Sequence, residues 1–294
     1  MVLPDFDYLA PTTLDEASNL LHELGEDAKV IAGGMDTFPP MKQGAFANCK
    51  YIIDLKHIPG LDKIEYDEKE GLKIGCLVKL FDIQTSELVK RVNPAVAQAA
   101  KYIASTQVRH KGTLMGNICA AVPSCDGGPI LLAENAKIIV RSYDETQTIP
   151  ADKFFTGVKK TCLAYDDIAT HIVIPPLTED EHAAYIKFAV RKAMDLAIVG
   201  VAAWLKMDGN VVADARIALG AVATTPILAP KAVEFLIGKE LTDDVIENCA
   251  LLAMYSCHPI SDVRASAEYR REMIRVFTKR AIRKALIGYG GDHI

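Results

Sequence analysis

Two glycine-containing segments are the residues of this chain best suited to hold a phosphorylated ligand. Residues 29–37 read KVIAGGMDT, an apolar stretch of strand type that runs into Gly33 and Gly34 and then toward a helix start. Successive N–H groups in such a turn can form a concave anion site, and glycine lets a phosphate approach the backbone closely. An ordinary tight turn accounts for the same residues, so this segment alone leaves both interpretations open.

A second segment, residues 113–117 with the sequence TLMGN, has a similar character. Gly116 offers close backbone approach, Thr113 a hydroxyl donor and Asn117 an amide. Neither segment is specific alone. Together they suit a dinucleotide, which has two phosphates and two ribose ends to be held.

Two charged residues are candidates for the remaining contacts of such a ligand. Asp126 lies in the stretch AVPSCDGGP and can accept hydrogen bonds from ribose hydroxyls, or it can cap the following helix. Lys187, in the strand-like stretch YIKF, can supply a positive charge, or it can be a solvated strand position.

Hydrophobic periodicity predicts the elements that must position these loops. Residues 13–24 have helical spacing, with a capping box from Thr13 to Glu16 and Gly25 at the end. The segment 105–121, which contains the second glycine, has little periodicity and is interpreted as a functional loop. The other elements predicted in this half are strands at 28–32, 51–55, 136–141 and 169–174, a hairpin over 61–66 and 71–75, and helices at 94–103 and 128–134.

After the proline pair 175–176 the pattern changes. Gly209 and Asn210 supply a hairpin turn within an antiparallel meander, and helical periodicity follows Pro226. The predicted strands are 183–190, 196–207 and 211–222, and the predicted helices are 229–237, 243–254 and 265–286.

The last predicted helix is strongly basic. Residues 264–284 carry eight basic side chains against Glu268 and Glu272, and apolar residues at helical spacing give the helix one buried face. The basic face can be an ordinary solvated surface, or it can dock on an acidic face of a partner subunit. Nucleic-acid binding is not expected, because the chain has 33 basic against 38 acidic residues and a net charge of -5.

Composition excludes several classes of protein. Of the 294 residues, 50% are hydrophobic, which is enough for packed cores, but the longest apolar run, residues 196–205, is half of the ~20 residues that a membrane span needs. The first residues do not resemble a signal peptide, so we expect a cytoplasmic protein. The Rossmann, P-loop, nucleophile-elbow and zinc-helix motifs are missing. The seven cysteines have no cluster spacing and are expected to be buried, reduced thiols, and the scattered histidines indicate no metal site.

Five ordered motifs resemble the FAD-binding subunits of the molybdenum hydroxylases, the family that includes xanthine, carbon monoxide and nicotinate dehydrogenases. They are AGGMD at 32–36, IASTQVRHKGTLMGN at 103–117, the AxPxxD stretch ending at Asp126, KFxxRxxMDxAxV at 187–199 and ASAEYRR at 265–271. The similarity extends from Phe6 to about Leu286, and among family members the nicotinate dehydrogenase flavin subunit is most similar. The usual family pattern of the second segment is T-[IL]-G-G-N, and this chain has Met115 at the first of those glycines.

The resemblance implies an α+β protein with a two-lobed FAD-binding domain of the vanillyl-alcohol-oxidase (PCMH) type at 1–176, the lobes dividing near residue 58. A smaller domain of the CO-dehydrogenase-flavoprotein type, with antiparallel sheet and helices, follows at 177–294. The resemblance also implies that the two glycine segments hold the FAD pyrophosphate, that Asp126 binds ribose and that Lys187 lies near the cofactor. The implied cofactor-binding residues are Val30, Ile31, Ala32, Gly33, Gly34, Met35, Asp36, Thr37, Thr113, Leu114, Met115, Gly116, Asn117, Asp126 and Lys187.

The function implied by the resemblance is electron transfer within a multi-subunit oxidoreductase. Partner subunits would carry the molybdenum cofactor and the 2Fe–2S clusters, and FAD on this chain would pass electrons to an external acceptor such as NAD(P). The substrate of the complex would be nicotinate or another N-heterocycle. No catalytic side chain and no metal site is expected here, whereas Asp195 and Leu196 either lie near the isoalloxazine ring or are plain strand residues. A free-standing flavin oxidoreductase and a flavin-free assembly subunit are the alternatives.

Overall fold

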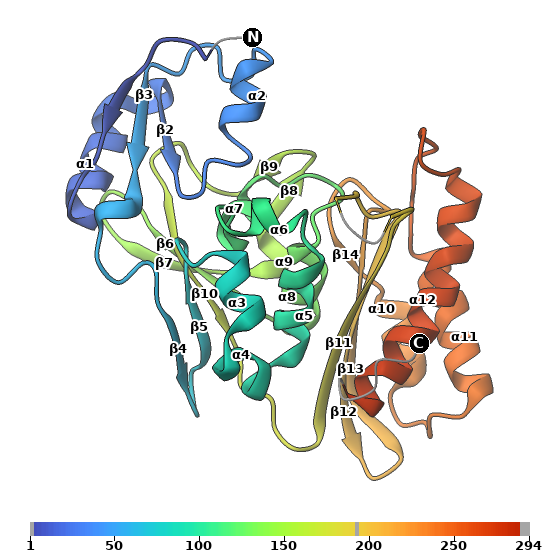
Figure 1. The fold of residues 1–294 in the computed structure, drawn as a ribbon. Helices are drawn as coiled ribbons and strands as arrows, with labels where there is room; N and C mark the ends of the chain where they lie inside the picture. Colours follow the sequence, from blue (N-terminus) through green and yellow to red (C-terminus); the bar gives the residue numbers. More distant parts are fainter. Residues whose placement is uncertain (1–2, 192–193, 289–294) are drawn as a thin grey trace.

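The computed structural model describes residues 3–191 and 194–288 of an α+β chain, arranged as a two-lobed domain followed by a helix-backed antiparallel sheet (Figure 1). The first lobe is built on a parallel sheet in the order β1-β3-β2. Its elements are β1 (Asp7–Leu9), α1 (Leu14–Leu24), β2 (Ala28–Ile31), α2 (Phe38–Lys42) and β3 (Tyr51–Asp54). Helix α1 begins as predicted, because the Thr13 side chain accepts a hydrogen bond from the N–H of Glu16, and it ends at Gly25 with φ +58°.

The second lobe has an antiparallel sheet in the order β4-β5-β10-β6-β7, and the predicted hairpin forms its β4 and β5. The strands are β4 (Ile64–Asp67), β5 (Gly71–Gly75), β6 (Lys137–Arg141), β7 (Thr146–Pro150) and β10 (Ile168–Ile174), with a small pair β8 (Phe155–Gly157) and β9 (Lys160–Thr161). The helices are α3 (Leu80–Thr85), α4 (Glu87–Val92), α5 (Pro94–Tyr102), α6 (Thr106–Arg109), α7 (Leu114–Cys119), α8 (Gly127–Ala133) and α9 (Ala151–Phe154).

The segment 105–121 is not the irregular loop that its weak periodicity predicts. It contains the short helices α6 and α7, and each is started by a side-chain cap. The Ser105 hydroxyl accepts from the N–H of Val108, and the Thr113 hydroxyl accepts from the N–H of Gly116. Helices of four and six residues are too short for a 3.6-residue period to be visible in the sequence.

The C-terminal domain is an antiparallel sheet in the order β11-β12-β13-β14 with three helices on one face (Figure 1). Gly209, with φ +59°, makes the predicted turn between β12 and β13. The elements are β11 (Glu181–Phe188), β12 (Val199–Asp208), β13 (Val211–Gly220), β14 (Ile227–Leu228), α10 (Pro230–Leu236), α11 (Asp243–Tyr255) and α12 (Ala267–Ile287). Because β12 begins at Val199, Asp195 and Leu196 precede the strand, and the interpretation of these two as strand residues is wrong.

Both faces of the C-terminal sheet are buried. Val201, Ala203 and Leu205 of β12 pack with α10–α12, whereas Ala202 and Trp204 belong to the core that also fills the two-lobed domain. Helix α8 lies against β12 and β13 on this second face. The sheet is therefore a layer shared by the two domains.

The basic side chains of α12 are largely paired within the subunit. Helices α11 and α12 lie side by side, and Glu247 of α11 contacts both Arg275 and Lys279. Asp243 accepts from Arg283 at 2.7 Å. These pairs use three of the cations on which the docking hypothesis depends.

Cysteine placement agrees with the expectation only in part. All seven cysteines are free thiols, and five are buried, but Cys119 is half-buried and Cys162 is exposed.

No helix within residues 3–191 and 194–288 has the length and apolar character to cross a membrane.

Candidate functional site

The two glycine segments lie against each other at the boundary between the lobes. Gly33 packs on the backbone ahead of the second segment so tightly that a Cβ there would lie 2.0 Å from the carbonyl oxygen of Lys111. Gly34 has φ +70°, a conformation that favours glycine. Gly33 therefore has a structural role in joining the lobes and Gly34 in making the turn before α2, whatever ligand the segments hold.

The first segment presents unpaired backbone donors. Within the part of the chain that the structure describes, the N–H groups of Gly34, Met35 and Asp36 have no hydrogen-bond acceptor, whereas those of Thr37 and Phe38 donate to the Gly34 carbonyl. Burial raises the pKa of the Asp36 carboxyl group beside these donors. Free N–H groups in a row are the chemistry that an anionic group such as a phosphate requires.

The second segment forms the start of α7. The Thr113 hydroxyl accepts from the N–H of Gly116 at 2.9 Å, and the Asn117 side chain accepts from the N–H of Gly127 at 3.0 Å. Met115, the residue that departs from the family pattern, lies in this helix with its side chain buried in the core, and its φ is not positive. The methionine is therefore accommodated without backbone strain.

A buried ion pair joins the two domains beside these segments. Lys187 Nζ lies 2.7 Å from Asp126 Oδ2, and each side chain is 7% exposed. Tyr185 donates its hydroxyl to Asp126 Oδ1 at 2.9 Å, and Lys187 also donates to the Tyr102 carbonyl at 3.0 Å. Burial raises the pKa of Asp126, whereas Lys187 and Tyr185 oppose this shift.

Two of the alternatives that the sequence leaves open are excluded by this arrangement. Asp126 is the N-cap residue of α8, but its side chain makes no capping hydrogen bond. Lys187 is buried against Asp126 and is not a solvated strand residue. Their roles toward a cofactor remain predictions.

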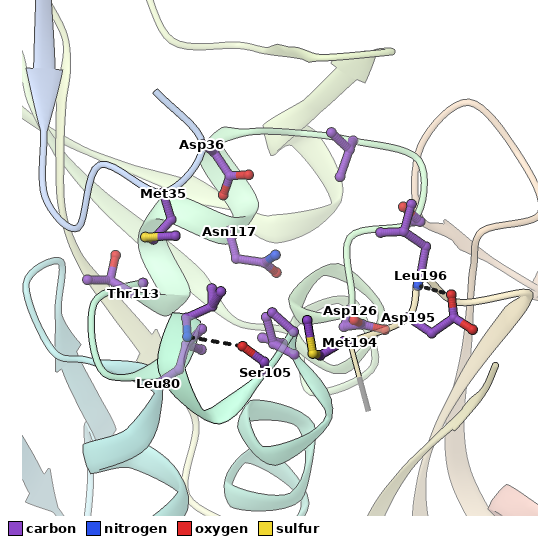
Figure 2. A pocket seen from close by; sticks show the side chains of 16 residues that line it. Met35, Asp36, Leu80, Ser105, Thr113, Asn117, Asp126, Met194, Asp195 and Leu196 are labelled. Carbon is purple, nitrogen blue, oxygen red and sulfur yellow. Dashed lines mark hydrogen bonds between the residues drawn. The ribbon is translucent and has the colours of Figure 1, made fainter. Parts of the chain in front are cut away.

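Two pockets meet at the glycine segments. The interdomain pocket, with a volume of about 340 Å³, is lined by residues of both lobes and by Met194, Asp195 and Leu196 of the C-terminal domain (Figure 2). The interlobe pocket, of about 350 Å³, is lined by both lobes and includes Lys29 and Asp167. Each glycine segment contributes residues to both pockets, so the segments form the boundary between them.

Most of the predicted site residues line these two pockets. The interdomain pocket is lined by Met35, Asp36, Thr113, Asn117 and Asp126, and the interlobe pocket by Val30, Ala32, Met115 and Gly116. Ile31 and Leu114 belong instead to the hydrophobic cores, and Thr37 begins α2 without a side-chain capping bond. No cluster of metal-ligating side chains occurs among the residues described.

Sequence reasoning missed Tyr185 and the Met194 side chain, both of which belong to the site. Tyr185 had a usable signal, because it lies two residues before Lys187 and strand residues at that spacing share a face. Met194 had none, since it comes from an irregular segment whose position depends on the tertiary fold.

Comparison with known proteins gives matches over nearly the whole chain. Residues 4–177 match the family described as "FAD binding domain in molybdopterin dehydrogenase", and residues 184–285 match "CO dehydrogenase flavoprotein C-terminal domain". The carbon monoxide dehydrogenase medium chain of Hydrogenophaga pseudoflava is 35% identical over 97% of this chain and 98% of its own length. The nicotine 6-hydroxylase medium subunit of Paenarthrobacter nicotinovorans is 33% identical over 97% and 99%. A crystal structure of the Hydrogenophaga pseudoflava carbon monoxide dehydrogenase superimposes with a TM-score of 0.93 at 34% identity, covering 98% of this chain and 99% of that one.

Proposed function

Because this chain belongs to the FAD-binding medium subunits of the molybdenum hydroxylase family, we propose that it holds FAD across its two glycine segments and passes electrons from an iron–sulfur partner subunit to an external acceptor. The observation that carries this proposal is the pair of pockets on either side of those segments. Each has the volume of a small-ligand site, and a dinucleotide has two ends joined by a pyrophosphate.

The residues present fit such a ligand. The free N–H groups of Gly34, Met35 and Asp36 face no acceptor within the described residues and can donate to pyrophosphate oxygens. Gly116 keeps side-chain atoms away from the same boundary, since a Cβ there would come within 3.1 Å of the Thr113 hydroxyl oxygen. FAD bound here would supply the redox chemistry, while the protein supplies position and electrostatics.

We assign the isoalloxazine end to the interdomain pocket and the adenosine end to the interlobe pocket. The interdomain pocket combines the apolar side chains of Met35, Leu80 and Leu196 with the carboxyl group of Asp126, a lining that suits a flat ring followed by hydroxyl groups. Asp195 lies at the same pocket. Desolvation opposes its ionisation, but hydrogen bonds from the N–H groups of Arg191 and Leu196 outweigh this and lower the pKa of Asp195. A carboxylate here would disfavour negative charge on a neighbouring ring and so tune its redox potential.

The proposal extends to the rest of the complex. We propose an iron–sulfur subunit and a molybdopterin-binding subunit as partners, NAD(P) as the acceptor, an N-heterocycle such as nicotinate as the substrate of the complex and the cytoplasm as its location. The supports are that one relative is named for nicotine and that it and the carbon monoxide dehydrogenase chain are named as medium subunits.

Flavin content is the direct test. The purified chain should absorb at about 450 nm and should co-purify with iron- and molybdenum-containing chains when expressed with them. Anaerobic addition of NADH or NADPH should bleach that absorbance if a nicotinamide nucleotide is the acceptor. A chain that binds no FAD on reconstitution would refute the proposal, and bleaching by neither nucleotide would refute the assigned acceptor.

A further inference from the structure

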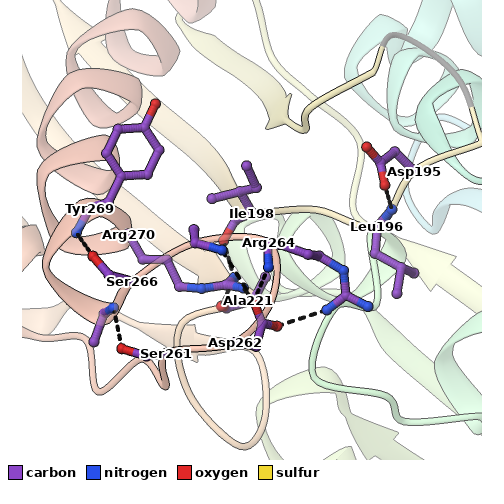
Figure 3. A network of polar contacts seen from close by, with 12 residues as sticks. Asp195, Leu196, Ile198, Ala221, Ser261, Asp262, Arg264, Ser266, Tyr269 and Arg270 are labelled. Atoms are coloured by element: carbon purple, nitrogen blue, oxygen red, sulfur yellow. Dashed lines mark hydrogen bonds and ion pairs between the residues drawn. The ribbon is translucent and has the colours of Figure 1, made fainter.

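A buried arginine, Arg270, connects several segments near the interdomain pocket. Its side chain is 4% exposed and comes from α12. The guanidinium group donates to the carbonyl of Ile198 at 2.6 Å, to the carbonyl of Ala221 at 3.2 Å and to Asp262 Oδ1 at 2.8 Å (Figure 3). Three acceptors from three separate segments thus converge on one buried charge.

Two of these acceptors lead directly to the interdomain pocket. Ile198 lies two residues after Leu196, which lines the pocket, and its N–H donates to the Phe188 carbonyl of β11. Ala221 has φ +62°, and its N–H donates to the carbonyl of Pro123 at 3.0 Å.

Pro123 lies between Val122 and Ser124, which line the opposite part of the same pocket. The Arg270 guanidinium therefore bonds directly to the segment of Leu196 on one side of the pocket, through the Ile198 carbonyl. It reaches the segment of Pro123 on the other side through two hydrogen bonds in series, with Ala221 between them.

The third acceptor, Asp262, completes the charge balance. It also accepts from the N–H of Arg264 at 2.9 Å and from the Arg264 guanidinium at 2.8 Å. Partial burial opposes its ionisation, but the Arg264 N–H and the Arg270 side chain outweigh this and lower the pKa of Asp262 to about 2. The pair with Arg270 therefore stays charged throughout the physiological pH range.

Among the residues that the structure describes, Asp195 makes its hydrogen bonds within its own segment. The hydrogen bonds that it accepts come from Arg191 and Leu196, in its own segment, and so do not fix the segment against the pocket. The hydrogen bond from Arg270 to the Ile198 carbonyl fixes the segment, because the guanidinium is buried and is held in place by its other two acceptors.

We propose that Arg270 is a positioning residue that fixes the Asp195–Leu196 segment against the isoalloxazine end of FAD. The inference rests on the proposed function, because it takes the interdomain pocket as the site of that ring. Without the guanidinium, the buried carbonyl of Ile198 and the half-buried carbonyl of Ala221 would lose this donor, and the segment would no longer be tied to α12.

The test compares Arg270→Gln and Arg270→Lys with the control Arg264→Gln, all in the full chain. The control removes a contact to the same Asp262 but none to Ile198 or Ala221. Each protein is titrated with FAD, and the visible circular dichroism and midpoint potential of the bound flavin are measured together with thermal unfolding of the flavin-free chain.

We expect Arg270→Gln to raise the dissociation constant for FAD about tenfold and to change the flavin dichroism and potential, with partial rescue by Arg270→Lys and no change in the control. Wild-type affinity, dichroism and potential in Arg270→Gln would overturn the inference. If Arg270→Gln does not fold, Arg270→Lys is compared with the control instead. An affinity, dichroism or potential that departs from wild type in the same direction is expected, and wild-type values of all three would overturn the inference. A wild-type chain that binds no FAD would instead refute the proposed function.

Discussion

Replacing Lys187 with methionine tests how the two domains are held together at the interdomain pocket. The substitution keeps most of the aliphatic side chain but leaves the Asp126 carboxylate, 7% exposed, without its charged partner, while the Tyr185 hydroxyl still donates to it. Removing one member of a buried pair costs ~3–5 kcal/mol, because the remaining charge is uncompensated. We therefore expect the free energy of unfolding of the flavin-free chain to fall by about that amount near neutral pH.

The loss should depend on pH in a definite direction. Burial already raises the pKa of Asp126, and without Lys187 the pKa should rise further. A carboxyl group whose pKa is higher in the folded than in the unfolded state destabilises the fold above its unfolded pKa, and this penalty disappears as the pH falls below that value. The cost of Lys187→Met should therefore shrink on acidification.

The double variant Lys187→Met with Asp126→Asn separates the pair from its surroundings. If the cost comes from the unpaired carboxylate, the double variant should recover at least about 2 kcal/mol relative to the sum of the single losses. Lys50→Met is the matched control. Lys50 pairs with Asp27 at the same 2.7 Å but with a side chain that is 66% exposed, so its loss should have little effect on stability. Denaturant unfolding is measured for the wild type, the two single variants, the double variant and the control. If the free-energy losses of Lys187→Met and Asp126→Asn add within about 0.5 kcal/mol in the double variant, the reasoning is refuted.

Four further substitutions probe other parts of the molecule. Burial raises the pKa of Glu134 to about 8, so the folded chain holds a proton that the unfolded chain releases. The free energy of unfolding should therefore fall by on the order of 2 kcal/mol as the pH rises from about 5 to 7, and denaturant unfolding of Glu134→Gln should show no such decline. Gly116→Ala should weaken FAD binding about tenfold in a flavin titration, with a smaller loss of stability than Gly33→Ala. A Cβ at Gly116 comes within 3.1 Å of the Thr113 hydroxyl oxygen, whereas one at Gly33 would lie 2.0 Å from the Lys111 carbonyl oxygen; equal stability losses would contradict this. Arg275→Glu should lower the melting temperature, because the new carboxylate would repel Glu247. An unchanged melting temperature would show that the ion pair with α11 does not stabilise the fold.

Local sequence signals predicted the regular elements well. The capping residue Thr13 and the turn at Gly209 each determine structure over a few residues, and the corresponding elements are present. The exceptions were short helices such as α7, where one capping bond from Thr113 replaces a hydrophobic repeat.

Contacts between distant segments were beyond such signals. The partner of Asp126 comes from a strand that begins more than fifty residues later, and the acids that pair with the basic face of α12 come from another helix. The glycine segments were identified as candidates from the residues alone, but the contact between Gly33 and Lys111 that explains one of the glycines depends on how the lobes meet.

The shared C-terminal sheet has a consequence for the modularity of the subunit. Two separate family models divide the chain between residues 177 and 184, yet Trp204 and Tyr185, from the second half, lie in the core of the first. A gene fragment that ended at this division would expose the face of α8 that packs on β12 and β13. The two halves are therefore units of sequence but not autonomous folding units, and a single proteolytic cut near residue 178 should leave them associated as a non-covalent heterodimer.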